Sequence, residues 1–241
     1  MELHIVVGML ASAAISALFG FLCVRSTRIF FSILTLALSQ VLWSLAFKFF
    51  WVSGGTDGIH VPRPSLLGGM VSFTGGGAFL RFVNSYYYYV LAIASLAAAV
   101  MWLIVHSPFG KALQAIRDNE TRASFVGIRV RRYRWIAFVI SGTFTGLAGA
   151  LWVPLNGLTT PEILYWPFSG EIVFMTVLGG FRSFTGPIVG AIAFNYLKVY
   201  AVASSQYWQL VLGCVLVVLV MVLPTGIVGT LSRLGAKLGR R

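Results

Sequence analysis

Residues 210–223 read Leu-Val-Leu-Gly-Cys-Val-Leu-Val-Val-Leu-Val-Met-Val-Leu, and no charged or amide side chain interrupts this run. A membrane-spanning β-strand needs about ten residues in which apolar and polar side chains alternate. The run does not alternate, so the sequence excludes a β-barrel. It favours a helix that is surrounded by lipid or by other helices.

The rest of the chain has the same character. Of its 241 residues 58% are hydrophobic and only 10% are charged, whereas soluble domains carry about 25% charged residues. A soluble core cannot bury that much apolar surface. We therefore expect an all-α polytopic membrane protein.

Hydrophobic segments can be marked at seven places. Their approximate ranges are 4–23, 29–52, 86–105, 135–153, 168–180, 187–203 and 208–223. Because a helix needs about 20 residues to cross the hydrocarbon core, the first four segments are long enough and the last three are short. Segment 168–180 lies between Pro167 and the Gly179-Gly180 pair, which predicts a half-span or a re-entrant helix.

The net charge of +12 would suggest a nucleic-acid partner in a soluble protein. Here the basic residues gather in short loops, as topology signals do, so no nucleic-acid partner is expected. The ranges 24–28, 106–134, 181–186 and the tail 224–241 hold 14 of the 18 Lys and Arg residues. These segments are therefore predicted to face the cytoplasm, with the carboxyl terminus on that side.

The segments predicted to face outward are of a different kind. Residues 53–85 are rich in Gly, Ser and Pro, which predicts an irregular outward loop. The four tyrosines at 86–89 follow it, and Tyr is favoured where a span meets the membrane surface. We interpret them as part of an aromatic belt.

The basic loop 106–134 is predicted to contain one helix outside the bilayer, over residues 108–127. Ser107 can cap its start, Pro108 suits its first position, and Gly127 can close its end. An interrupted apolar face opposite charged residues would let this helix dock into a groove on a soluble partner. From composition alone, a plain basic loop held in the cytoplasm is an equally good interpretation.

The run Ser107-Pro108-Phe109-Gly110-Lys111-Ala112-Leu113-Gln114-Ala115-Ile116-Arg117-Asp118-Asn119-Glu120, with Ala123 and Gly127-Ile128 after it, resembles a coupling loop. It is similar to the loop of ABC importer permeases, specifically the branched-chain amino acid permease family of LivM type. In that family the loop docks onto an ATPase subunit. The resemblance gives the candidate ATPase-coupling residues as Gly110, Lys111, Ala115, Arg117, Glu120, Ala123 and Gly127.

Further motifs resemble the same family in the same order along nearly the whole chain. They are Leu34–Ala37, Gly54–Ile59, Gly142–Ala150, Leu178–Gly180 and Gly186–Ala191. The family usually begins with more hydrophobic sequence, including a Gly-rich segment, which has no match before the first span. This departure predicts a start that is truncated relative to the family, or a missing part that belongs to another chain.

A second group of candidates concerns helix packing or the transport pathway. Its members are Gly142, Gly146, Gly149, Gly179, Gly180, Gly186, Pro187 and Glu171. The first three glycines lie on nearly one helix face, where they permit close helix approach or, alternatively, substrate contact. The later Gly and Pro residues form either a hinge beside the path or simple turns. Glu171 either faces an outer vestibule or is an interfacial residue without a role.

The resemblance implies the permease subunit of an ABC importer for branched-chain amino acids, in one transmembrane permease domain over residues 1–241. It implies a bacterial cytoplasmic (inner) membrane location. The implied partners are ABC ATPase subunits, a second permease subunit, an extracytoplasmic substrate-binding protein and the lipid membrane. The chain lacks the phosphate-binding loop G-x-x-x-x-G-K-[ST], so we expect no ATPase activity of its own, and no cofactor or metal is expected.

Other functions stay open at this point. Permeases for urea and short-chain amides share much of the same pattern. A secondary transporter or channel without an ATPase would need coupling or pore-lining charges in mid-membrane. A membrane-embedded enzyme would need paired catalytic groups at one depth. Neither requirement is visible in the predicted spans.

Overall fold

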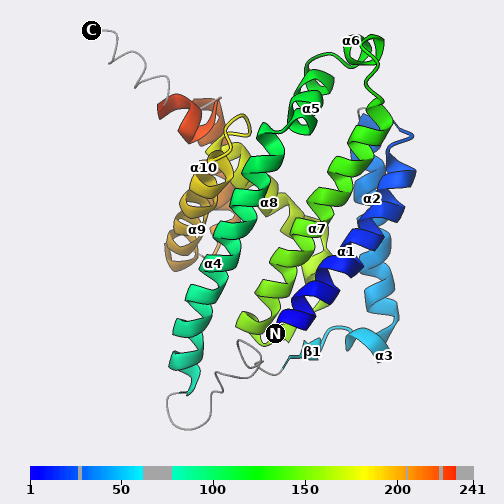
Figure 1. Cartoon of the computed structure of the whole chain (residues 1–241). Helices are drawn as coiled ribbons and strands as arrows, with labels where there is room; N and C mark the ends of the chain where they lie inside the picture. Colours follow the sequence, from blue (N-terminus) through cyan, green and yellow to red (C-terminus); the bar gives the residue numbers. More distant parts are fainter. Residues whose placement is uncertain (27–28, 62–77, 205, 223–224, 232–241) are drawn as a thin grey trace. The chain divides into compact units, whose positions relative to one another are not determined.

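The computed structural model describes residues 1–26, 29–61, 78–204, 206–222 and 225–231, and these fold almost wholly into helices (Figure 1). Five of the helices are long and apolar enough to cross a membrane. The prediction of an all-α polytopic membrane protein is therefore confirmed. The chain divides into two compact units, Met1–Ile163 and Leu164–Arg241, so one permease domain over the full length stays a prediction.

The first unit contains most of the helices and a small two-stranded sheet. Its elements are α1 (Glu2–Cys23), α2 (Ile29–Lys48), α3 (Phe50–Ser53), β1 (Ile59–His60), α4 (Ala78–His106), α5 (Pro108–Asp118), α6 (Glu120–Phe125), α7 (Val130–Asn156) and β2 (Leu158–Thr159). The 3-10 helix η2 (Pro161–Leu164) follows at the boundary between the units. The four candidate spans in this unit are α1, α2, α4 and α7.

The contact between α1 and α7 is the most extensive in the first unit. Small residues allow it, because a Cβ at Gly142 would collide with Ser16 and one at Gly146 with Ser12. The hydroxyl of Ser12 donates a hydrogen bond of 2.6 Å to the carbonyl oxygen of Gly142. Such short approaches between backbones hold helices together in lipid, where the hydrophobic effect cannot.

Helix α4 begins at Ala78, so residues 78–85 are helical and the predicted irregular loop was wrong there. Phe82 and Tyr86 are buried, and their rings stack with centroids 5.2 Å apart. The hydroxyl of Tyr86 donates a hydrogen bond of 2.6 Å to the carbonyl of Leu151 in α7. Tyr86 thus joins two spans rather than an aromatic belt, while Tyr87 and Tyr88 remain exposed.

The segment predicted at 29–52 is also divided. Helix α2 ends at Lys48, Phe49 leaves the helical conformation, and α3 forms one more turn. The hydroxyl of Ser53 donates back to the carbonyl of Ala46, which stabilises this turn against the end of α2.

Strands β1 and β2 pair antiparallel, with Ile59 opposite Thr159 and His60 opposite Leu158. Gly54 and Gly58 before the pairing have φ values of 68°, which glycine adopts without strain. The pairing attaches the segment after α3 to the end of α7.

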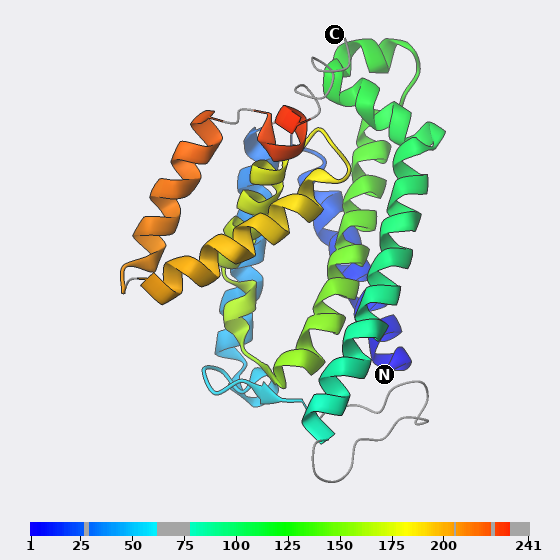
Figure 2. The ribbon, with the colours of Figure 1, turned by 90° about the vertical axis from the view of Figure 1, so that its left-hand side faces the viewer.

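The second unit contains α8 (Trp166–Gly179), α9 (Gly186–Ser204) and α10 (Trp208–Val222), which pack on one another (Figure 2). Among the described residues of this unit, α9 alone is long enough to be a candidate span, and the 14 residues of α8 extend over about 21 Å. The prediction of short segments holds for α8 and for the described residues of α10, whereas the segment predicted as short at 187–203 forms the 19-residue candidate span α9. Leu178, Phe194 and Leu216 form a buried core among the three helices.

The turn between α8 and α9 depends on glycine. Gly180 ends α8 with a φ of 108°, and α9 starts at Gly186 with Pro187 in its first turn. A Cβ at Gly179 or Gly186 would collide with backbone across the turn. The two helices therefore form a tight hairpin, in agreement with the predicted helix break. The role of this turn as a hinge beside the transport path stays a prediction.

Parts of four predicted segments lie outside the described residues. They are 27–28 of the basic loop 24–28, including Arg28, 62–77 of the predicted outward loop, 223 of the last hydrophobic segment, and 224 with 232–241 of the basic tail, including Arg233, Lys237, Arg240 and Arg241.

The α1–α7 contact gives the first prediction. We expect Gly146→Val to lower the free energy of unfolding by about 1–3 kcal/mol, because the new side chain overpacks against Ser12. Thermal unfolding of the purified chain in detergent measures the change. Gly149→Val is the matched control, because nothing lies within 4 Å of a Cβ at that position. Equal shifts in the two variants would contradict the packing role of Gly146.

Candidate functional site

Helix α5 starts at Ser107, directly after α4 ends. The Ser107 hydroxyl accepts the N–H of Gly110 at 3.4 Å and donates to the carbonyl of Ile104 at 2.6 Å, and Pro108 occupies the first turn. This confirms the predicted cap. Gly110 is buried against the carbonyls of Ile104 and Val105, where any Cβ would collide with backbone. The chain can therefore turn sharply from α4 into α5.

The single helix predicted over 108–127 was wrong, because Asn119 divides it into α5 and α6. Asn119 has φ −158° and ψ 106°, and its N–H still bonds to the carbonyl of Ala115. Its side-chain Oδ1 accepts the N–H of Arg122 at 3.0 Å. Asn119 thus ends one helix and caps the next, a role in which its short amide side chain is favoured. Gly127 follows α6 with a φ of 89°, as expected for the residue that closes a helix.

We call residues 108–126, which comprise α5, α6 and the C-cap residue Val126, the α5–α6 segment. Two contacts attach it to the start of α7, and a third attaches it to Ile128, just before that helix. A nitrogen of Arg134 lies 2.7 Å from Oε2 of Glu120, the rings of Phe109 and Tyr133 stack at 5.4 Å, and the N–H of Ile128 bonds to the carbonyl of Ala123. The ion pair is about one-third exposed, so its net contribution to stability is small, about 0–1 kcal/mol. Its value is to fix the direction of α6 relative to α7.

The predicted coupling residues differ in exposure. Gly110 and Ala123 are buried and Glu120 is half-buried, whereas Lys111, Ala115, Arg117 and Gly127 are exposed. The first three position the α5–α6 segment, and only the exposed four are open to a partner in this structure.

Of the two most exposed apolar residues of this region, Val126 belongs to the apolar face predicted from the sequence, whereas Phe125 was not singled out. The side chains of Phe125 and Val126, at the end of α6, are 85% and 82% exposed. An apolar pair just before a helix-closing glycine is the signal that could have identified them. Next to this segment lies a pocket of about 510 Å³ lined by Ile116, Asn119, Glu120 and Arg134 among others.

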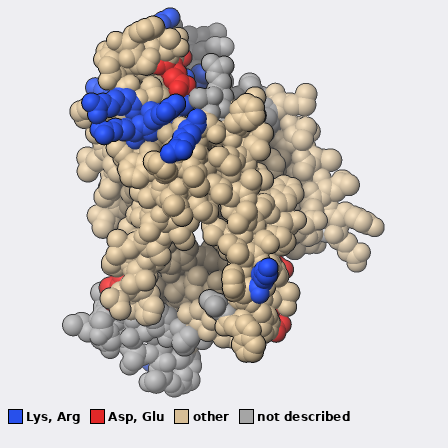
Figure 3. Space-filling model, turned by 90° about the vertical axis from the view of Figure 1, so that its right-hand side faces the viewer, with Lys and Arg blue, Asp and Glu red and all other residues tan. Residues whose placement is uncertain are grey.

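Basic side chains gather at the same end of the first unit (Figure 3). They include the exposed residues Lys111, Arg117, Arg122, Arg129, Arg131 and Arg132. The spans beyond them carry few charges on this face.

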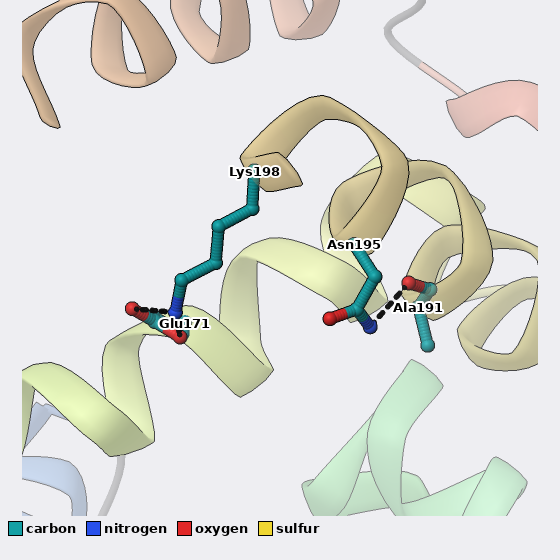
Figure 4. Close-up of polar contacts among 4 residues, drawn as sticks. All are labelled: Glu171, Ala191, Asn195 and Lys198. Atoms are coloured by element: carbon teal, nitrogen blue, oxygen red, sulfur yellow. Dashed lines mark hydrogen bonds and ion pairs between the residues drawn. The ribbon is translucent and has the colours of Figure 1, made fainter. Parts of the chain in front are cut away.

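A second polar site lies in the second unit, between α8 and α9 (Figure 4). The ammonium of Lys198 donates to both carboxylate oxygens of Glu171, at 2.9 and 2.8 Å. It also lies 5.6 Å from the centre of the Trp208 ring. This pairing was not predicted, because the two partners are 27 residues apart and lie on different helices.

The glycines of α7 occupy two environments. Gly142 and Gly146 contact α1, whereas Gly149 borders an apolar pocket of about 580 Å³ that Ile5, Gly146 and Ala150 also line. Whether this pocket belongs to a transport pathway stays a prediction. Within the described part of the chain, no three His, Cys, Asp or Glu residues are grouped so as to hold a metal ion.

Comparison with known proteins identifies the family. Residues 1–221 match the model of the permease component of the branched-chain amino acid transport system. The chain belongs to this family. The resemblance to branched-chain amino acid permeases is thereby confirmed.

Several curated permeases are similar to this family member. LivM, a high-affinity branched-chain amino acid transport permease of Escherichia coli K12, is 28% identical over 237 residues, which cover 92% of the chain and 56% of LivM. LivH of the same strain is 30% identical over 143 residues, or 58% of the chain and 45% of LivH. The guanosine ABC transporter permease NupP of Bacillus subtilis 168 is 32% identical over 117 residues, or 46% of the chain and 32% of NupP.

The chain thus spans about half the length of the LivM proteins that it matches. No solved structure gives a significant match. Family membership and the apolar helices together make this a multi-pass membrane protein.

The cap at Asn119 gives the second prediction. We expect Asn119→Ala to speed amide hydrogen exchange in residues 120–125 by about 2- to 30-fold, because a lost N-cap costs about 0.5–2 kcal/mol. Exchange followed by mass spectrometry measures this. Asn119→Asp keeps the side-chain acceptor and should exchange like the unaltered chain. Unchanged exchange in Asn119→Ala would mean that the cap does not hold α6.

Proposed function

We propose that the chain is a transmembrane permease subunit of a bacterial ATP-driven importer of branched-chain amino acids. The family match and the names of LivM and LivH support the cargo class. The observation that carries the importer mechanism is the α5–α6 segment. It lies beyond the ends of α4 and α7 and ends in the exposed apolar pair Phe125 and Val126 (Figure 1).

In this proposal, partner ATPase subunits bind the α5–α6 segment and hydrolyse ATP, while this chain provides the pathway. Phe125 and Val126 would insert into an apolar pocket on the ATPase, where burial of their side chains would anchor the complex. The exposed basic residues around them would orient the encounter. Movement of the ATPase would reach α7 through the contacts of Glu120 with Arg134 and of Phe109 with Tyr133.

The same proposal assigns the topology and the other partners. The basic end of the first unit would face the cytoplasm of a bacterial inner membrane, in keeping with the positive-inside rule, and so would the carboxyl terminus. A second permease chain would complete the path. An extracytoplasmic binding protein would deliver the cargo at the opposite end of the first unit, where β1 and β2 pair.

The docking role gives the third prediction. We expect Phe125→Asp to weaken binding of the co-expressed ATPase about thirtyfold, because loss of a central aromatic anchor costs about 2 kcal/mol or more. Co-purification through a tag on the permease, in mild detergent, measures the bound ATPase.

Trp51→Asp is the matched control for this experiment. Trp51 is 98% exposed and belongs to α3, at the other end of the first unit (Figure 1). The Trp51→Asp variant should bind the ATPase as well as the unaltered chain does. Equal binding in the Phe125 variant and the unaltered complex would show that the α5–α6 segment is not the docking site.

The cargo gives the fourth prediction. Proteoliposomes that contain the complete importer should take up leucine, isoleucine and valine when ATP is supplied, and should not take up guanosine, ribose or urea. Radiolabelled uptake with and without ATP checks this. Uptake of guanosine alone would contradict the proposed cargo but not the ATP-driven mechanism. Uptake without ATP would favour a channel or a secondary transporter.

A further inference from the structure

The Glu171–Lys198 pair lies within apolar helices rather than at their ends. Along α9, Lys198 is about 18 Å from Gly186 and about 9 Å from Ser204, at 1.5 Å per residue. Its side chain does not extend toward the end of the helix but bonds to Glu171 on α8. An ionisable pair at such a depth is costly unless it faces water or protein.

The packing of α8 against α9 does not need these charges. The apolar core of Leu178, Phe194 and Leu216 and the close approach at Gly179 and Gly190 already join the helices. An ion pair that is about one-third exposed contributes little net stability. The pair is therefore better explained by recognition than by stability.

About one-third of each side chain is exposed, 34% for Lys198 and 31% for Glu171. Hydrocarbon lipid is a poor neighbour for exposed charges, so this surface faces water or a partner in the assembled protein. Asn195, one turn before Lys198, is also exposed, and its amide donates to the carbonyl of Ala191 in its own helix (Figure 4).

We propose that Glu171 and Lys198 form a subsite of the translocation path that binds the α-ammonium and α-carboxylate groups of a zwitterionic amino acid. This inference rests on the proposed importer function. The ligand ammonium donates to the Glu171 carboxylate, and the ligand carboxylate accepts from the Lys198 ammonium. Both new contacts are charge-assisted hydrogen bonds, which are the strong kind.

The empty site and the loaded site have the same net charge, because both the pair and the ligand are neutral overall. Without ligand, the two side chains neutralise each other, which lowers the cost of keeping them in the membrane. With ligand, the Trp208 ring remains next to Lys198 and contributes a cation–π contact. The subsite therefore recognises the α-ammonium and α-carboxylate groups that all α-amino acids share. The aliphatic side chain of the ligand is recognised at another site.

The test is ATP-driven uptake of radiolabelled L-leucine by the complete importer in proteoliposomes. Three variants are compared with the unaltered protein. The first, Glu171→Gln with Lys198→Met, removes both charges but keeps similar volumes. The second, Glu171→Lys with Lys198→Glu, exchanges the charges and keeps an ion pair. The third, Asn195→Ala, is the matched control on the same helix.

We expect both double variants to purify with their ATPase in normal amounts and to take up leucine about tenfold or more slowly, because charge-assisted hydrogen bonds to the ligand are lost or reversed. The exchanged pair fails because Cα is chiral, so reversing its two charged groups redirects the leucine side chain. Asn195→Ala should take up leucine normally.

Two results would contradict the proposed amino acid subsite without contradicting the proposed importer function. Normal uptake by the neutral variant would show that the charges are dispensable, and recovery of uptake in the exchanged variant would show that the pair is only structural. If the unaltered importer takes up no amino acid, the proposed function itself is wrong and the subsite with it.

Discussion

Water is absent from the core of a bilayer, so every backbone N–H and C=O there must find its partner within the protein. Helices satisfy this requirement within themselves. Because lipid is as apolar as the side chains, no hydrophobic effect drives the helices together, and close packing has to hold them. In the first unit that packing is concentrated where α1 meets α7, at Ser12, Gly142 and Gly146. The other spans of this unit are arranged around that contact, as the hydrogen bond from Tyr86 of α4 to Leu151 of α7 illustrates.

Much of the fold could be predicted from the sequence because apolar length is a strong local signal. All seven apolar segments contain a helix, and of the three predicted as short, α8 and the described part of α10 are short while α9 is long enough to be a candidate span. The cap at Ser107 was predictable for the same reason, since Ser followed by Pro is a local signal for a helix start. The motif from Ser107 onward also led to the correct family, because its residues stand close together in the chain.

The features that the sequence predicted wrongly or not at all depend on weak local signals or on contacts between distant residues. Asn119 is a cap in the middle of a run that otherwise suits a helix, and only the hydrogen bond to Arg122 shows its effect. The early start of α4 depends on stacking of Phe82 with Tyr86 and on burial against α7. Glu171 and Lys198 each look like isolated charges until the turn at Gly179 and Gly186 folds α8 onto α9. Tertiary contacts of this kind leave no periodic pattern in the sequence.

Helix α7 is attached to other parts of the first unit at both of its ends. Near its start, Arg134 bonds to Glu120, and just after its end, Leu158 and Thr159 pair with β1. Its 27 residues make a rod of roughly 40 Å. If it pivots near the middle, where Gly142 contacts α1, a tilt of about 5° moves each end by roughly 2 Å in opposite directions. In that case the close contact of α7 with α1 would be the pivot through which a displacement at one end of the helix reaches the other end.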